Sequence, residues 1–187
     1  MEAIKSILAG IFISLAGLAY LKIGGVIGAV LFSFGLLGVI MTDSLLYTGR
    51  IYYERFIKPL SQVLLWNVVG CAIFGLMSRA SFPELKQTAE EIIATRINDG
   101  YLACFLKGSF CGVIMTGAVM GMKEKQPWLL FFGIPMFILS GFYHSVADSF
   151  YFFMAPDLWY LPKWCMIVLG NFLGGRLYFL KSVWMEK

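Results

Sequence analysis

The only histidine of the chain, His144, stands in the run from Gly141 to Asp148, near the middle of a long apolar segment. An ionisable side chain at such depth in a membrane costs about 3 kcal/mol on insertion scales, and it usually faces a bundle interior or an aqueous path. An unperturbed imidazole has a pKa of about 6.5, so it exchanges protons near neutral pH. His144 is therefore either a neutral ring hydrogen-bonded between helices or a residue of a transport path.

Three other charged residues, Asp43, Lys107 and Asp148, lie in or beside apolar segments. Lys107 is about 10 Å inside its segment at 1.5 Å per residue. Its ammonium either extends to the lipid headgroups or forms a fixed charge that draws anions inward. Asp148 follows His144 by four residues, so it either shares a helical face with the ring or caps a half-helix. Asp43, in the other interrupted segment, could likewise share a helical face with a neighbouring side chain or cap a half-helix.

Thr48 precedes a glycine, and its hydroxyl could hydrogen-bond a nearby imidazole, a passing solute or its own backbone. Large apolar side chains surround these polar positions: Phe32, Leu36, Leu46 and Phe137. They are typical of ordinary bundle packing, and they are equally typical of constrictions that exclude hydrated ions.

The composition indicates a polytopic membrane protein. The chain has 187 residues, of which 59% are hydrophobic and 14% charged, and its mean hydropathy is +0.78. A membrane-spanning helix needs about 20 mainly apolar residues. Six such segments are predicted, at residues 4–21, 26–47, 59–77, 101–122, 128–153 and 164–180. They leave no room for a soluble domain, so residues 1–187 are predicted to form one transmembrane domain.

Charge predicts the orientation. With six spans, both termini and the connections 50–58 and 123–127 share one side, which carries nine Lys and Arg residues against five on the other. The positive-inside rule then places both termini in the cytoplasm. The longest connection, 78–100, is predicted to form a short amphipathic helix with Pro83 in its first turn.

The other compositional signals exclude several functions. The net charge of +4 is spread over loop ends, so nucleic-acid binding is not indicated. The four cysteines lie in apolar segments without a C-x-x-C pair, which favours small core residues over a metal site or disulfides. We expect no metal and no cofactor.

Two segments are interrupted by small and polar residues, at 41–50 and at 141–149. In a chain of two three-helix halves these are the two middle helices, and paired breaks of this kind indicate inverted repeats with a substrate path between them. The segment after each break contains an N-x-x-G element, beginning at Asn67 and at Asn171. The sequence therefore predicts an all-α bundle of two inverted three-helix repeats.

The order and spacing of six elements resemble the formate/nitrite transporter family over nearly the whole chain. The elements are Ile13–Gly17, Gly28–Leu36, Leu46–Gly49, Phe105–Gly108 with Cys111, Gly141–Ala147 and Gly170–Gly175. The resemblance implies a homopentamer of aquaporin-like six-helix protomers in the cell membrane, with helices 2 and 5 interrupted. Each protomer would hold its own pore for small monovalent weak-acid anions such as formate, nitrite, hydrosulfide or lactate.

The resemblance also implies residue roles. The pore residues would be Thr48, Lys107, His144 and Asn171, with Lys107 in the vestibule. The apolar constrictions would be Phe32 and Leu36 with Phe137 on one side of the histidine, and Leu46 with Tyr47 on the other. The chain departs from the family pattern, which has glutamate at Leu45 and Tyr143 and asparagine at Arg50, Gly112 and Asp148. Asp43 and Asp148 would then belong to an altered polar network around the breaks.

The implied mechanism agrees with elementary physics. A bare anion crossing an apolar ring loses its hydration at a cost far above thermal energy, whereas a neutral weak acid loses little. An anion drawn in by Lys107 would be protonated at or near His144, cross as the acid and release the proton beyond. Two other functions stay open, a pore for water, ammonia or a small alcohol and a structural membrane scaffold. An intramembrane enzyme is disfavoured, since H-E-x-x-H and G-x-S-x-G motifs and paired aspartates are absent.

Overall fold

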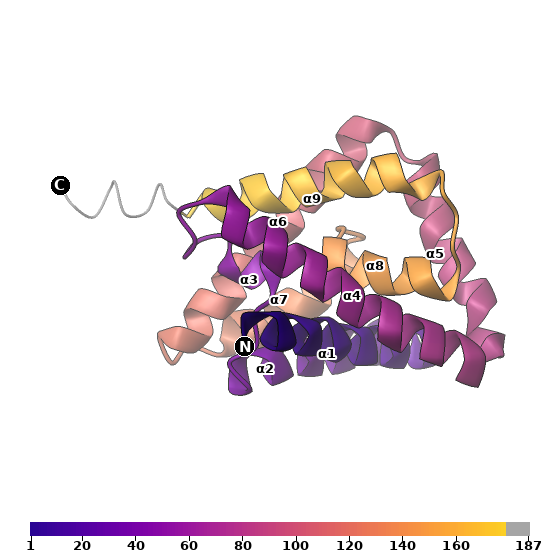
Figure 1. Ribbon diagram of the computed structural model, residues 1–187, viewed down its shortest axis with the longest axis horizontal. Coiled ribbons are helices and arrows are strands. Elements are labelled where there is room, and N and C mark those ends of the chain that lie inside the picture. Colours follow the sequence, from indigo (N-terminus) through magenta and orange to yellow (C-terminus); the bar gives the residue numbers. More distant parts are fainter. Residues whose placement is uncertain (179–187) are drawn as a thin grey trace.

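The computed structural model describes residues 1–178, and over these residues the chain is all-helical with no strand (Figure 1). The helices are α1 (Glu2–Ile23), α2 (Gly25–Met41), α3 (Tyr47–Arg50), α4 (Ile57–Ser81), η1 (Pro83–Leu85), α5 (Lys86–Asn98), α6 (Tyr101–Lys123), α7 (Trp128–Leu139), α8 (Ser145–Met154) and α9 (Tyr160–Arg176). By length and composition, α1, α4 and α6 could each cross a membrane, and α2 and α7 are shorter apolar helices.

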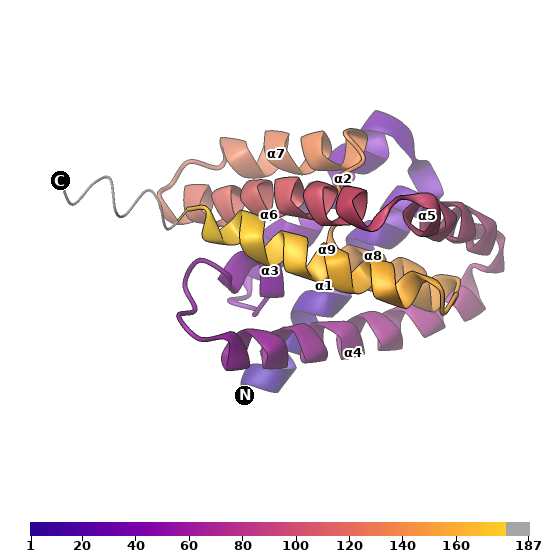
Figure 2. The ribbon, with the colours of Figure 1, turned by 90° about the horizontal axis from the view of Figure 1, so that it is seen from above.

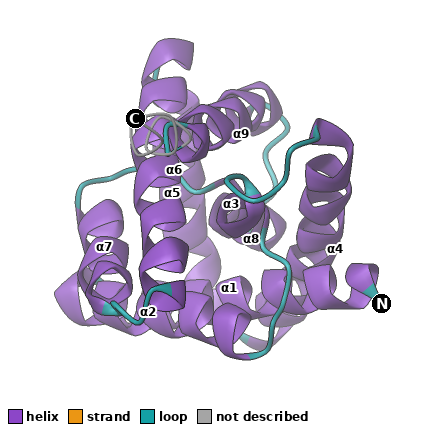
Figure 3. Cartoon of the chain, turned by 90° about the vertical axis from the view of Figure 1, so that its left-hand side faces the viewer, coloured by secondary structure: helices purple, strands orange, loops and turns teal. Residues whose placement is uncertain are grey.

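The long helices surround two short ones. Helices α3 and α8 lie in the middle of the bundle when it is viewed from one end (Figure 3). In Figure 2, α4 runs from left to right along the sequence, whereas α6 and α9 run from right to left. The first residue and the end of α9 lie toward the left of Figure 1, and α5 lies at the opposite end. The two halves of the chain therefore place corresponding long helices in opposite directions.

Two predicted apolar segments do not form continuous helices. Helix α2 ends at Met41 and helical structure resumes at Tyr47, while α7 ends at Leu139 and α8 begins at Ser145. Each break contains a residue in the left-handed conformation, Asp43 with φ 50° and Gly141 with φ 69°. Such a residue commonly ends a helix. In each break the next N–H donates to a carbonyl five residues earlier, at 2.9 Å in both.

Other boundaries differ from the predicted segments at their ends. Helix α9 begins at Tyr160, earlier than the predicted 164, and ends at Arg176; residues 179 and 180 of the predicted segment lie outside the described residues. The predicted short helix within 78–100 is present as η1 followed directly by α5, after α4 ends at Ser81. Pro83 occupies the first turn of η1, where its missing N–H costs no helical hydrogen bond.

A buried asparagine holds the first break in place. The Asn67 side chain is fully buried on α4, and its Oδ1 accepts the Tyr47 N–H at 2.8 Å. Its Nδ2 donates to the Ser6 carbonyl at 2.7 Å and to the Leu45 carbonyl at 2.8 Å. One side chain thus joins α4, the break and α1, and it satisfies backbone groups that the interrupted helix leaves without partners.

Asn171 does the same in the second half. Its Oδ1 accepts the Ser145 N–H at 2.9 Å, and its Nδ2 donates to the Gly108 carbonyl at 2.8 Å and the Tyr143 carbonyl at 2.9 Å. The side chain is fully buried. Equivalent atoms are therefore bonded in the two halves, which explains why an asparagine follows each break in the sequence.

The glycine of each N-x-x-G element permits close helix contact. A Cβ on Gly70 would collide with the Ile7 carbonyl oxygen of α1, and one on Gly174 would collide with the Ser109 carbonyl oxygen of α6. Helices that approach to backbone contact in this way use small residues at the crossing point. The glycine thus brings the neighbouring asparagine within hydrogen-bonding distance of the break.

Gly174→Ala is expected to destabilise the protein by about 1–3 kcal/mol, because overpacking a tight contact forces the backbones apart. Thermal unfolding of the purified protein in detergent measures the effect. Gly100→Ala is the matched control, since a Cβ there meets nothing within 4 Å. Equal melting temperatures for the two variants would contradict the assigned role of Gly174.

Candidate functional site

His144 caps the N-terminus of α8 with its own ring. Its Nδ1 accepts the Ala147 N–H at 3.0 Å, and its Nε2 lies 2.9 Å from Thr48 Oγ1. Because Nδ1 acts as an acceptor, a neutral ring carries its proton on Nε2 and donates it to the threonine. The sequence offered Asp148 as the cap of this half-helix; that option was wrong, since the ring of His144 occupies the position.

The imidazole and the hydroxyl come from the two breaks. Thr48 lies on α3 in the first half and His144 precedes α8 in the second, and both side chains are buried. Thr116 Oγ1 of α6 donates to the Thr48 carbonyl at 3.4 Å. On the other side, Asn171 holds the peptide groups of Tyr143 and Ser145, the residues that flank His144. The pair is therefore fixed from both halves of the bundle.

Aromatic rings lie against the imidazole. The ring of Phe137 has its centroid 6.0 Å from the His144 ring and 6.0 Å from the Phe32 ring, which it meets edge-on. Leu36 and Leu46 are also buried. Tyr47 lies apart from this cluster, since its hydroxyl donates to the Val168 carbonyl of α9 at 3.2 Å.

Two cavities approach this cluster from opposite ends of the bundle. One, of about 180 Å³, is lined by Phe32, Phe137 and His144 together with Arg96 of α5. The other, of about 80 Å³, is lined by Leu46 and by residues near the ends of α2 and α6, namely Ile40, Asp43 and Lys123. The aromatic rings, the imidazole and Leu46 thus lie between two hollows.

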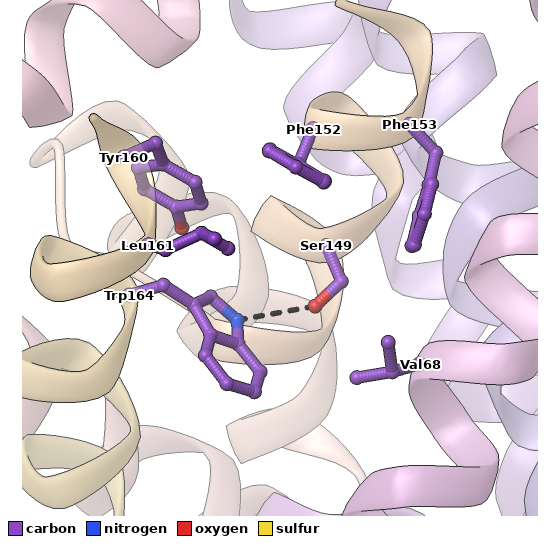
Figure 4. Close-up of a pocket in the computed structure, with 7 residues that line it drawn as sticks. All are labelled: Val68, Ser149, Phe152, Phe153, Tyr160, Leu161 and Trp164. Carbon is purple, nitrogen blue, oxygen red and sulfur yellow. Dashed lines mark hydrogen bonds between the residues drawn. The ribbon is translucent and has the colours of Figure 1, made fainter. Parts of the chain in front are cut away.

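A third cavity, of about 110 Å³, lies between α4, α8 and α9 (Figure 4). Its wall is largely aromatic, and in it the Trp164 indole donates to Ser149 Oγ at 3.1 Å. The same indole N–H is 2.9 Å from the Ser145 carbonyl. His144 does not line this cavity, so we assign it to helix packing beside the site.

The charge of Lys107 is compensated by a carboxylate that the sequence did not single out. Its Nζ donates to Asp99 at 2.7 Å and to the Tyr143 hydroxyl at 3.2 Å. The Tyr143 hydroxyl in turn donates to Asp99 at 2.5 Å. The only sequence signal for Asp99 was its position at the start of the lysine's segment.

Asp43 pairs with Lys5, which the sequence-based prediction did not include. The backbone shows that Lys5 is the counterpart of Lys107 in the other half. Leu45 N–H donates to the Lys5 carbonyl at 3.2 Å, as Tyr143 N–H donates to the Lys107 carbonyl at 3.4 Å. One lysine therefore stands beside each break.

Asp148 is 1% exposed and forms an ion pair with Arg96 of α5, at 3.2 Å between Nη2 and Oδ1. Arg96 belongs to the connection that the sequence indicated only as an amphipathic helix.

Within residues 1–178, no group of three His, Cys, Asp or Glu side chains could hold a metal ion. The Cys71 side chain is buried and forms no disulfide, and its thiol donates to the Val146 carbonyl at 3.3 Å.

An apolar helical bundle with two matched breaks, a buried imidazole between them and a cavity on either side defines a membrane transport protein. The chain belongs to the formate/nitrite transporter family, whose model matches residues 2–185. This match confirms the resemblance inferred from the sequence. No curated protein matches the chain.

Solved structures agree on the fold. The chain is similar to a pentameric formate channel with formate bound, with 20% identity over 99% of this chain and 96% of that chain and a TM-score of 0.86. It is also similar to an FNT family ion channel, with 19% identity over 100% of this chain and 90% of that chain and a TM-score of 0.87.

The Asp99 ion pair predicts a pH effect on stability. Partial burial disfavours the Asp99 carboxylate, but hydrogen bonds from Lys107 and Tyr143 outweigh it and hold the Asp99 pKa below its ordinary value of 3.8. A depressed pKa in the folded state contributes stability above the unfolded value, and this contribution disappears as the pH falls through the folded value. Asp99→Asn should therefore lower the melting temperature near neutral pH, with the difference shrinking in acid.

Melting temperatures of both proteins in detergent from about pH 3 to pH 7 provide the measurement. Asp157→Asn is the matched control, because its exposed side chain oxygen accepts the Trp159 N–H at 2.9 Å and an amide oxygen keeps that bond. A gap between wild type and Asp99→Asn that stays constant with pH would contradict the assignment.

Proposed function

We propose that the chain is a subunit of a homopentameric membrane channel for small monovalent anions of weak acids, which permeate with a proton. The observation that carries the proposal is the buried Thr48–His144 pair, joined at 2.9 Å between two cavities. Family membership and the likeness to a pentameric formate channel support it. Formate, nitrite and hydrosulfide are the proposed substrates.

We further propose that the whole chain, residues 1–187, forms one transmembrane domain with six spans. They would be α1, α2 with α3, α4, α6, α7 with α8, and α9, arranged as two inverted repeats. The repeated asparagine contacts and the opposite directions of α4 and α9 support this arrangement. The first residue and the end of α9 lie at the same end of the bundle. Because the predicted side that holds both termini carries nine Lys and Arg residues against five on the other, we place both termini on the cytoplasmic side of a cell or plasma membrane.

The proposed permeation route follows from the free-energy cost of moving an anion through apolar surroundings. Lys107 would draw an anion toward the cavity beside His144, and its bond to Asp99 would be exchanged for a bond to the anion. The apolar rings of Phe32 and Phe137 lie next, where an ion would lose its hydration without compensation. The solute would therefore cross as the neutral acid, with Leu36 and Leu46 completing the apolar path.

The hydrogen bonds of His144 indicate how it would act. A second proton on the ring would sit on Nδ1, which could then no longer accept the Ala147 N–H and cap α8. The ring therefore favours the neutral form, which presents Nε2–H to Thr48 or to a solute in its place. In this proposal His144 donates a hydrogen bond that orients the solute, and the proton that neutralises the anion arrives from the cavity.

One observation favours a second function, a pore for a neutral solute such as water or ammonia. The two charged residues that line the cavity beside His144, Arg96 and Asp148, form an ion pair, so this lining contributes little net charge. Comparing fluxes of formate, water and glycerol through the same vesicles separates the two functions. Absence of flux for formate, water and glycerol alike would favour a structural scaffold. We propose transport rather than catalysis.

His144→Phe is expected to reduce formate uptake into proteoliposomes by about tenfold or more at every pH, because the ring orients the solute and does not supply its proton. The phenyl ring removes a hydrogen bond, which contributes about 1.5 kcal/mol to solute stabilisation, or about a factor of ten. Thr48→Val keeps the shape of the threonine and removes the hydroxyl, so it should also reduce uptake.

Size-exclusion chromatography checks that each variant keeps the assembly state of the wild type. Arg79→Gln, on the exposed end of α4, controls for reconstitution. Unchanged, pH-dependent formate uptake by a correctly assembled His144→Phe protein would overturn the role of the histidine.

A further inference from the structure

The cavity beside His144 contains an arginine that the proposed mechanism does not use. Arg96 lies on α5, at the end of the bundle opposite the first residue, and its side chain is 15% exposed. It lines the same cavity of about 180 Å³ as His144, Phe137 and Asp148. A solute that moves between this end of the bundle and His144 would pass the guanidinium.

The guanidinium is held from three directions. Its Nε and Nη2 donate to the two oxygens of Asp148 at 3.4 and 3.2 Å, and its Nη1 donates to the Ile92 carbonyl at 3.1 Å. The Tyr143 ring centroid lies 4.4 Å from its central carbon. Among the described residues these three bonds use three of the five guanidinium N–H groups, so two can donate to another acceptor.

The bonds to Asp148 are long for their type. Charge-assisted N–H to carboxylate bonds are typically about 2.7–2.9 Å, and both bonds from Arg96 exceed this range. A buried ion pair gains little net free energy, because desolvation offsets the attraction. The guanidinium N–H groups that Asp148 and the Ile92 carbonyl do not use are therefore available to a second anion, whose attraction to the guanidinium must outweigh its repulsion by the Asp148 carboxylate.

We propose that Arg96 is an anion-binding residue of this cavity, specific for small planar anions with two oxygens, such as formate and nitrite. The proposal rests on the proposed transport function and names its selectivity determinant. A guanidinium presents paired N–H groups that match the two oxygens of such an anion, which a lysine ammonium cannot do. The cavity of about 180 Å³ accommodates an anion of three non-hydrogen atoms with water, since a single water needs about 10–15 Å³ of such cavity volume.

Tyr143 connects this site to the vestibule lysine. Arg96 lies 4.4 Å and Lys107 Nζ 4.9 Å from the centroid of the same ring. An anion released by Lys107 therefore reaches a second cation after a short passage along Tyr143. From Arg96 it meets the imidazole of His144, which lines the same cavity.

The test uses a double variant, Arg96→Gln with Asp148→Asn, because removing Arg96 alone leaves a buried carboxylate unpaired. The KM for formate uptake by proteoliposomes is expected to rise about tenfold, which corresponds to about 1.4 kcal/mol, while the maximal rate changes less. Arg96→Lys keeps the charge and loses the paired donors, so it should raise the KM for formate similarly. Arg79→Gln, on the exposed end of α4, is the control and should keep the wild-type KM.

A second measurement does not depend on flux. Formate or nitrite should raise the melting temperature of the wild-type protein in detergent, and hydrosulfide at equal concentration should raise it less. This stabilisation should be lost in Arg96→Lys and in the double variant. A wild-type KM and wild-type stabilisation by formate in these variants would overturn the assignment of Arg96.

The two proposals fail in different ways. Absence of saturable formate uptake by the wild-type protein would overturn the transport function. Stabilisation by formate that depends on Arg96 would still support the binding site in that case. Saturable uptake whose KM is unaffected by Arg96→Lys and by the double variant would leave transport intact and remove Arg96 from it.

Discussion

Backbone hydrogen bonding in an apolar bundle is the constraint on which the rest of this structure depends. Breaking a helix exposes peptide groups, and within a membrane no lipid group can bond them. Asn67 and Asn171 supply the missing partners, each with one accepted and two donated hydrogen bonds. The close helix approach at Gly70 and Gly174 brings these amides within reach. Both breaks are thereby held as fixed parts of the fold.

The site follows from these two fixed breaks. Thr48 from one and His144 from the other meet at 2.9 Å, although they are 96 residues apart in the sequence. Capping α8 through Nδ1 settles which ring nitrogen faces Thr48. On the Arg96 side of the imidazole, Arg96 is paired with Asp148 and Lys107 with Asp99. In the proposed function, a small anion that enters this cavity would form hydrogen bonds comparable to those of the ion pair that it replaces.

Much of this arrangement was predictable from the sequence. The runs at 41–50 and 141–149 predicted the positions at which the helices end, because small and polar residues there interrupt apolar segments. The N-x-x-G elements pointed to Asn67 and Asn171 without revealing their purpose. Lys5, Arg96 and Asp99 were not identified, since charged residues near the ends of apolar segments are ordinary. Their partners lie 38, 52 and 8 residues away in the sequence.

The sequence by itself determined the family, the all-helical class, the positions of the breaks and the residues His144, Thr48 and Lys107 as the polar groups in apolar surroundings. These features depend on local composition and on spacing along one chain. Only the tertiary structure decided that His144 caps α8, that Tyr47 points away toward α9, and that Arg96 pairs with Asp148 beside the imidazole. The physical reason is that hydrogen bonds and ion pairs act over a few ångströms, so they join segments whose proximity only packing can produce.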